Sequence, residues 1–344
     1  MSGKKSKKGL TAFLIIISVI VVIIFGATLI SIFGKTGTFN LSSNGDFLST
    51  ASSISFDNNL FSKKPKSIKG KYLAVIYIEG TIQKAGSTYN QEWLLNTIAK
   101  LKEDKKNEGI LLFIDSPGGT VFESDEAYLT LQDYKTSGKK VYAYMGSLAA
   151  SGGYYIACAA DHITANRNTL TGSIGVIAGQ SIDLSEFLED HGIKYTTITA
   201  GKNKNMGNYN EPLSKEQKEI LQSIADDCYG QFTSIVSSSR NIPYKEILPL
   251  CDGRIYTASQ ALKNGLVDSI ATSYDSYLDF LLEEGQVFEN CKIVNFRYTK
   301  QRSLMESLMG FTSKLSGATS NTIEGIPYSV WEEMNLKGPL YLYR

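Results

Sequence analysis

The sequence predicts an α/β protein, with one domain built on a parallel sheet and preceded by a single apolar helix. Three observations support this prediction. Short runs of β-branched and aromatic residues alternate with amphipathic helical patterns between about residues 71 and 298. An uncharged apolar run occupies residues 9–34. The chain is 344 residues long and 42% hydrophobic, which is enough for one sizeable buried core.

The composition argues against several classes of function. The 35 Lys and Arg residues balance the 34 Asp and Glu residues, so the net charge of +1 provides no basic field for nucleic acid. The four cysteines form no CxxC pair, and only two histidines could join them as ligands. We therefore expect no metal, no cofactor and no nucleic-acid partner. The disulfide state of these cysteines stays open: Cys158, Cys228, Cys251 and Cys291.

The first 34 residues are typical of an uncleaved membrane anchor. Lysines at positions 4, 5, 7 and 8 precede a run of 26 residues, Gly9–Gly34, that contains no charge. A helix of this length spans about 39 Å, and a cleaved signal peptide has a shorter apolar region. Because the lysines stay in the cytoplasm, we expect a single-pass cell-membrane protein. Its segments would be a cytoplasmic 1–9, a transmembrane 10–34 and an extracytoplasmic main domain.

The remaining chain divides into three predicted parts. Residues 35–70 are rich in Ser, Thr, Asn and Gly and lack apolar periodicity, which is typical of a flexible linker. Residues 71–298 form the main domain. Residues 299–344 form a C-terminal extension whose pattern indicates no role.

Within the main domain, the patterns predict the elements one by one. Buried strands are expected at Tyr72–Ile78, Ile110–Ile114 and Val141–Tyr144, and a further strand at Tyr195–Thr199. Helices are expected at Gln91–Lys102, Phe122–Tyr134, Leu184–His191, Lys215–Ser239 and Ala258–Lys263. In such an alternating arrangement, functional residues gather at the carboxyl ends of the strands.

Two loops follow predicted strands and could carry chemistry. The loop Asp115–Thr120 (DSPGGT) places two glycines where backbone amides can approach a ligand, although this sequence also suits a plain turn. The loop Met145–Tyr155 (MGSLAASGGYY) surrounds Ser151 with small residues before an apolar helix. That serine could be a nucleophile beside free amides or an N-cap in a tight packing joint, and the local pattern favours neither.

A serine nucleophile needs a base, and neither histidine is an obvious candidate. His162 lies in a strand-like segment, and His191 ends a predicted helix, where capping is the expected role. A lysine could serve instead if its pKa, normally about 10.4, falls by about 3 units in a dry apolar pocket. Spacing alone does not select one lysine from the 35 basic residues.

Five motifs in order resemble the signal peptide peptidase A (SppA) family. This resemblance implies a serine-lysine protease of the Clp/crotonase fold, with repeated strand-strand-helix units, in its short, single-domain, membrane-anchored form. It covers roughly Lys71–Ser273. The motifs are Ala74–Ile82, Ile114–Tyr128, Met145–Asn166, Thr169–Val176 and Asp252–Asp268.

The resemblance also implies roles for individual residues. Ser151 would be the nucleophile, and Lys204 the general base, because Gly201 followed by Lys204 matches the G-x-x-K spacing of the family whereas Lys202 does not. Ser173 would orient the lysine amine. The amides of Gly118 and Gly152 would form the oxyanion hole, and Gly119 would shape the strand that pairs with extended substrate.

The function implied is that of an endopeptidase that degrades cleaved signal peptides and unfolded polypeptides outside the cytoplasm. The resemblance further implies a ring-shaped homo-oligomer, such as an octamer, in which neighbouring subunits could share Ser151 and Lys204. Two alternatives compete with it. A crotonase-like acyl-CoA enzyme is disfavoured because its thioester substrate is cytoplasmic, whereas the main domain is expected outside the cytoplasm. An inactive membrane scaffold is disfavoured because Ser151, Lys204 and Ser173 are all present.

Overall fold

The computed structural model describes residues 69–283, 285–300, 322–323, 326–327 and 340–342. The predicted anchor at 10–34, nearly all of the predicted linker at 35–70 and most of the predicted extension at 299–344 lie outside these residues. Within the described ranges, no helix is both long enough and apolar enough to cross a membrane.

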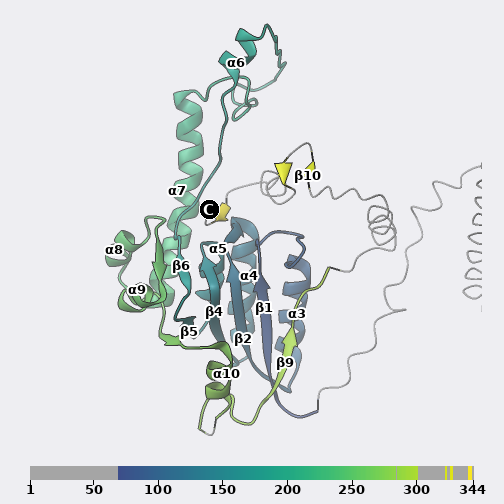
Figure 1. Cartoon of the computed structure of the whole chain (residues 1–344), viewed down its shortest axis with the longest axis vertical. Helices are drawn as coiled ribbons and strands as arrows, with labels where there is room; N and C mark the ends of the chain where they lie inside the picture. The colour runs from purple at the N-terminus through teal and green to yellow at the C-terminus, as the bar shows by residue number, and fades with distance from the viewer. Residues whose placement is uncertain (1–68, 284, 301–321, 324–325, 328–339, 343–344) are drawn as a thin grey trace, which may run out of the picture. The chain divides into compact units, whose positions relative to one another are not determined.

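A mixed sheet of eight strands forms the centre of the described domain (Figure 1). Six strands lie in the order β7-β6-β4-β2-β1-β9, and β5 and β8 continue from β4 along a second path. The pairs are parallel except for β6 and β7, which confirms the α/β prediction with one antiparallel pair. The strands are β1 (Tyr72–Glu79), β2 (Asn107–Ser116), β4 (Lys140–Ala150), β5 (His162–Asn166), β6 (Leu170–Gly172), β7 (Ile255–Thr257), β8 (Ser269–Ala271) and β9 (Lys292–Phe296).

Two hydrophobic clusters cover the two faces of this sheet. Because side chains alternate along a strand, Ala74 and Ile76 of β1 join one cluster, whereas Leu73 and Val75 join the other. The helices α3 (Gln91–Glu103), α4 (Val121–Lys135) and α5 (Gly152–Ala157) pack in the first cluster. The helix α10 (Tyr274–Leu282) packs in the second. The buried strands predicted from β-branched runs are therefore confirmed for β1, β2 and β4.

Helix α7 (Lys215–Arg240) is anchored to the domain by one end only. A capping box between Ser214 and Gln217 starts it, and Asn241 in a left-handed conformation ends it. Its buried apolar residues, Phe232 and Val236, lie in its last third. The first half extends beyond the sheet and connects to the small helix α6 (Ser185–Asp190) at its outer end (Figure 1).

We call residues 178–226 the arm, and this segment has no core of its own. Gln217 is its only buried residue. Large apolar side chains are exposed on it, among them Ile182, Phe187 and Ile198, the last with 95% of its surface accessible. The strand predicted at Tyr195–Thr199 is wrong, because these residues are exposed and form no strand. Their backbone has no neighbouring strand with which to pair within the described chain.

The remaining elements are short. They include helices α8 (Tyr244–Ile247) and α9 (Ala258–Lys263), and a 3₁₀ turn, η2 (Leu248–Leu250). Two further pairs of strands lie outside the main sheet. One joins β10 (Thr322–Ile323) to β11 (Ile326–Pro327), and the other joins β12 (Leu340–Leu342) to β3 (Gly118–Thr120).

Candidate active site

Ser151 stands at the junction between β4 and α5 in a strained backbone conformation. Its φ of 54° and ψ of −117° lie where side-chain-bearing residues are rarely found. Although it occupies the N-cap position of α5, its side chain makes no capping hydrogen bond. The Oγ atom is buried and has no hydrogen-bond partner among the described residues. An N-cap role therefore does not explain this serine.

A backbone hydrogen bond holds this junction, and the lack of a side chain on Gly152 allows its neighbours to pack closely. The Ser151 amide donates to the carbonyl of Gly172 over 2.7 Å. A Cβ atom built on Gly152 would lie 2.5 Å from Ser124 Oγ and 3.1 Å from the amide nitrogen of Gly119. Only glycine fits at position 152 without displacing these neighbours. This close approach brings the DSPGGT loop against the nucleophile candidate.

The three glycines predicted to bind the oxyanion or the substrate strand, Gly118, Gly119 and Gly152, have different surroundings. Gly118 has a φ of 102°, and its amide donates to Ser116 Oγ over 3.0 Å. This predicted oxyanion donor is therefore engaged in the isolated chain. Gly152 is the first residue of α5, where an amide has no carbonyl within the helix to bond. Gly119 packs so closely on Ile82 that a Cβ would lie 1.8 Å from the Ile82 carbonyl oxygen.

Ser173 lies close to the same junction. It follows β6, has a φ of 49° and is buried, and its amide donates to the Arg254 carbonyl over 2.8 Å. Its neighbour Gly172 accepts the Ser151 amide, so two consecutive residues of this turn belong to the site. Ser173 also lines a cavity of about 390 Å³ together with Tyr229 and Asp226 of α7.

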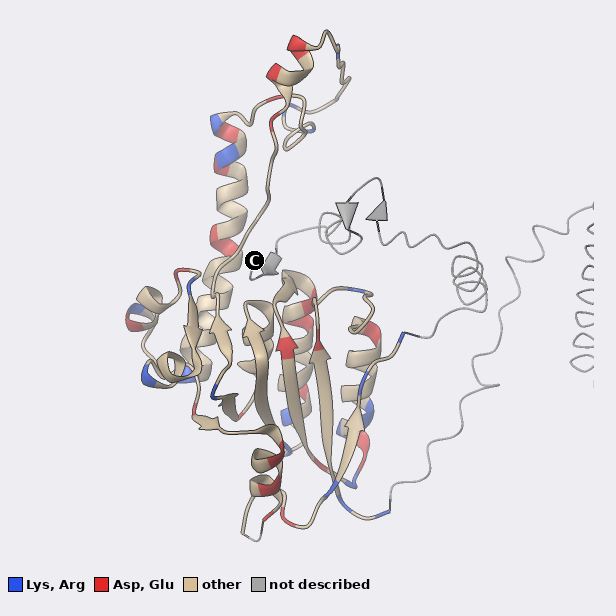
Figure 2. Ribbon diagram, viewed as in Figure 1, with Lys and Arg blue, Asp and Glu red and all other residues tan. Residues whose placement is uncertain are grey.

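The structure does not bring Lys204 to Ser151 within one chain. Lys204 is exposed in a series of turns between α6 and α7. Its amide donates to the Gly201 carbonyl over 3.1 Å, whereas Lys202 pairs with Glu216. The segment around Ser151 supplies no base either, because residues 145–160 contain no charged side chain. Figure 2 accordingly shows α5 without blue or red.

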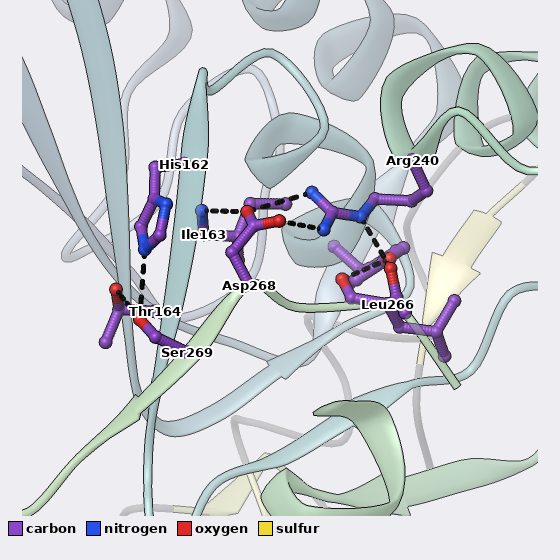
Figure 3. A network of polar contacts seen from close by, with 9 residues as sticks. His162, Ile163, Thr164, Arg240, Leu266, Asp268 and Ser269 are labelled. Atoms are coloured by element: carbon purple, nitrogen blue, oxygen red, sulfur yellow. Dashed lines mark hydrogen bonds and ion pairs between the residues drawn. The ribbon is translucent and has the colours of Figure 1, made fainter. Parts of the chain in front are cut away.

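Both histidines have structural partners instead of Ser151, and Figure 3 shows those of His162. His162 Nε2 lies 3.0 Å from Ser269 Oγ, which in turn lies 2.8 Å from Thr164 Oγ1. His191 ends α6, and its Nδ1 atom lies 2.8 Å from the Phe187 carbonyl oxygen. The predicted capping role of His191 is confirmed. A histidine base for Ser151 is therefore not found.

The network beside His162 is an ion pair that ties α7 to the loop before β8. Arg240 pairs with Asp268, and the Asp268 carboxylate also accepts the Ile163 amide over 2.7 Å. Burial alone would raise the pKa of Asp268, but the hydrogen bonds from Arg240 and Ile163 lower it overall. Only 7% of the Arg240 side chain is accessible. These contacts fix the buried end of α7.

The cysteines and acidic residues offer no second chemistry in the described chain. No disulfide joins any of the four cysteines, all of which lie in the described chain, and burial raises the pKa of the Cys158 and Cys251 thiols to about 12, which keeps them protonated. No group of three or more His, Cys, Asp or Glu side chains in the described ranges could hold a metal ion.

Two features of the site were not predicted from the sequence. Ser124, one turn into α4, donates to the Thr120 carbonyl over 2.8 Å and fills the space beside Gly152. Asp115 Oδ1 accepts hydrogen bonds from Ser147 Oγ and the Leu148 amide at 2.7 and 3.0 Å, which ties the two glycine-rich loops together. In the sequence, this role of Ser124 is indicated only by its position four residues after Thr120. That spacing is informative only once the start of α4 is known.

Comparisons with known proteins identify the family of this chain. Residues 133–283 match the model of peptidase family S49. The chain is 37% identical over 247 residues to a protein of Synechocystis sp. named as a protease, covering 71% of this chain and 88% of that one. It is 31% identical to an Enterococcus faecium protein named as the signal peptide peptidase SppA, covering 79% and 81%.

A plant relative adds the reaction type. The chain is 30% identical to the chloroplastic serine protease SPPA of Arabidopsis thaliana, over 72% of this chain and 36% of that one. The residues that match the family model include Ser151, Ser173 and Lys204, whereas the loop Asp115–Thr120 precedes the matched range. The chain therefore belongs to the SppA group of peptidase family S49 and is a serine-type protease.

Proposed function

We propose that this protein is a membrane-anchored endopeptidase in which Ser151 is the nucleophile and Lys204 the general base. The observation that carries the proposal is the Ser151 hydroxyl, which is buried, strained and without a partner. A buried hydroxyl without a hydrogen bond costs about 1–3 kcal/mol. Such a cost is expected where a catalytic partner or a substrate completes the site.

The partner of Ser151 would come from a neighbouring copy of the chain. Lys204 lies on an arm that exposes large apolar side chains and has no buried apolar residue. Such a surface favours association, because burial of apolar area stabilises contacts at about 25 cal/mol per Å². We infer that the arm of each subunit covers the Ser151 junction of the next in a closed ring homo-oligomer, such as an octamer.

The chemistry proposed is acyl transfer. Neutral Lys204 accepts the proton of Ser151 as Oγ attacks the carbonyl carbon of a peptide. The amides of Gly152 and Gly118 stabilise the oxyanion, once Gly118 exchanges its bond to Ser116 Oγ for the substrate oxygen. The Lys204 ammonium group formed in this step then protonates the leaving nitrogen. The neutral amine that remains accepts a proton from water as the water hydrolyses the acyl-enzyme, and Ser151 Oγ takes that proton back as it leaves. Ser173 would hold the lysine amine in place.

The proposed substrates are cleaved signal peptides and unfolded polypeptides on the extracytoplasmic side of the membrane. An extended chain can pair with β3 through backbone hydrogen bonds, which requires no particular side chain. The anchor at residues 10–34 would hold the enzyme beside membrane-derived peptides. The Clp/crotonase fold and the cell-membrane location belong to the same proposal.

Hydrolysis of casein by the full chain, together with labelling by a fluorophosphonate probe, tests this proposal. Ser151→Ala should abolish both hydrolysis and labelling. Lys204→Ala should reduce hydrolysis at least about a hundredfold, the usual size of a general-base contribution. Lys202→Ala is the matched control and should keep activity within about twofold. If the probe does not label Ser151, the inactive membrane scaffold is supported instead. If hydrolysis is lost with Lys202→Ala but kept with Lys204→Ala, the general base is Lys202.

A further inference from the structure

Residues of β5, β8 and α10 line a cleft of about 430 Å³. Thr164 pairs with Ser269 where β5 meets β8, and α10 begins shortly after β8 ends. His162, which also lines the cleft, pairs with Tyr142 near the start of β4, whereas Ser151 follows the last residue of β4. The cleft therefore lies at the other end of β4 from the proposed active site. Its volume is within the range of about 300–1,000 Å³ that is common for small-ligand sites.

Hydroxyl groups make up most of the polar lining of this cleft. They belong to Thr164, Ser269, Thr272, Ser276 and Tyr277. Ser269 Oγ lies 2.8 Å from Thr164 Oγ1 and 3.0 Å from His162 Nε2, and Figure 3 shows these side chains meeting between β5 and β8. Because a hydroxyl group donates one hydrogen bond and accepts two, these side chains keep hydrogen-bonding capacity after they have bonded to one another.

The Tyr277 hydroxyl is buried in this cleft without a hydrogen bond. The residue is 5% exposed, and its Oη atom has no hydrogen-bond partner among the described residues. Burial raises the pKa of this hydroxyl overall, and the nearby Thr164 side chain lowers it. Since Thr164 also lines the cleft, the Tyr277 hydroxyl lies beside the other hydroxyl groups. Buried polar groups are nearly always hydrogen-bonded, so this hydroxyl indicates that the cleft binds a polar molecule.

The charges around the cleft indicate that this molecule is neutral. The described residues that line it include no Asp, Glu, Lys or Arg. The nearby Asp268 carboxylate is already bound by Arg240 and by the Ile163 amide. A charged ligand would therefore lose its hydration without gaining an opposite charge, which is unfavourable.

Aromatic rings give the cleft an apolar surface as well. Phe280 is 47% exposed, and its ring is stacked with the Tyr277 ring at 22° and 6.4 Å between centroids. On its other neighbour, Tyr277 stacks with Tyr144 at 5.7 Å, which fixes the ring that carries the free hydroxyl. The face of an aromatic ring is electronegative, so it attracts the C–H bonds of a saturated ring.

We propose that this cleft binds a neutral, polyhydroxylated ring such as a pyranose sugar, either free or as one unit of a glycan chain. The hydroxyl groups of the sugar exchange hydrogen bonds with Tyr277, Ser269 and Thr164, and its C–H face packs on Phe280. This inference goes beyond the proposed protease function, because no residue of the cleft belongs to that site. It assigns the protein a second site, for carbohydrate.

Saturation-transfer difference NMR on the full chain, kept in a detergent without a sugar headgroup, tests the inference. The probes are glucose and N-acetylglucosamine as free sugars, and maltotetraose and chitotetraose as glycan chains. We expect at least one of them to bind with a Kd in the millimolar range. Equal affinity for a monosaccharide and its tetrasaccharide would indicate a free sugar or a single chain unit, whereas at least tenfold tighter binding of the tetrasaccharide would indicate a glycan chain.

Two matched substitutions locate the binding in the cleft. Tyr277→Phe keeps the stacked ring, removes only the hydroxyl, and should weaken sugar binding about threefold to tenfold. Tyr274→Phe is the control, because its hydroxyl lies in the same helix and is also buried without a partner, but it does not line the cleft. This variant should bind sugar like the wild type. Phe280→Ala should weaken binding by a factor similar to that of Tyr277→Phe.

Three results would overturn the inference. The first is no saturation transfer to any of the four sugars. The second is equal affinity of the wild type and Tyr277→Phe, which would place sugar binding elsewhere. The third is displacement of the sugar by inorganic phosphate, which would make the cleft an anion site. Casein hydrolysis should be the same in both tyrosine variants, so loss of sugar binding alone leaves the proposed protease intact.

Discussion

Single residues hold the active-site junction in a conformation that the backbone would not adopt alone. Ser151 and Ser173 both have positive φ values, and each such residue costs on the order of 1 kcal/mol or more. The hydrogen bond from the Ser151 amide to Gly172 joins the two turns. The sequence indicates the small residues around Ser151, but it does not indicate which residue is strained, because strain depends on contacts with β3 and β6.

Gly152→Ala tests this close packing. The new methyl group would lie 2.5 Å from Ser124 Oγ and 3.1 Å from the Gly119 amide, so the loop must shift. We expect a loss of about 1–3 kcal/mol in the free energy of unfolding, measured in urea, and at least a tenfold loss of kcat/KM. Adding Ser124→Ala should recover part of the stability, since it removes the closest contact.

Gly230→Ala is the matched control for this substitution. Gly230 lies within α7, and no atom lies within 4 Å of a Cβ built on it. Alanine at this position should stabilise the helix by up to about 1 kcal/mol and leave kcat/KM unchanged. A Gly152→Ala variant as stable and active as Gly230→Ala would contradict the close approach of β3 to the nucleophile.

At the scale of elements, prediction succeeded where the periodicity of a segment and its burial agree. Helices α3 and α7 and strand β1 have patterns that their packing satisfies, so their positions follow from the sequence. The segment Tyr195–Thr199 alternates like a strand but contacts no strand in the described chain. β3 and β12 are three residues each, too short for a pattern, and their pairing depends on residues distant in sequence.

The exposed apolar residues of the arm give a prediction for this element. Ile198 is 95% accessible, so Ile198→Asp should leave the urea midpoint of the isolated chain unchanged. If the arm binds a neighbouring subunit, the same variant should shift the assembly toward monomer in analytical ultracentrifugation. Val287→Asp, at a 53% accessible position outside the arm, is the matched control and should assemble normally. Equal sedimentation of both variants would exclude Ile198 from the interface.

At the scale of the whole molecule, the two residues of the proposed dyad lie in different parts of the chain: Ser151 in the domain with the central sheet, and Lys204 on the arm. Ser151 is buried directly after β4 of the central sheet, whereas Lys204 is exposed in the turns between α6 and α7. The resemblance to the SppA family predicts both residues and allows them to come from neighbouring subunits, whereas the residue pattern alone indicates neither. An arm without a core makes physical sense if its apolar side chains become buried in an assembly.

Mixed assemblies of two inactive chains test whether the site is shared. In a ring, a chain with Ser151→Ala still supplies Lys204, and a chain with Lys204→Ala still supplies Ser151. Random mixing of equal amounts should therefore leave about a quarter of the junctions with both residues, and should restore about that fraction of wild-type kcat. The two chains would be co-expressed with different tags, purified through both tags and assayed on casein.

The matched control replaces the second chain by one with both Ser151→Ala and Lys204→Ala. That mixture contains no nucleophile, so it should stay inactive although its assembly is the same. Doubly tagged assemblies of the single variants that show only background hydrolysis would mean that Ser151 and Lys204 do not meet across a subunit boundary. In that case the arm would have to fold back onto its own chain, and the partner of the buried Ser151 hydroxyl would have to be sought there.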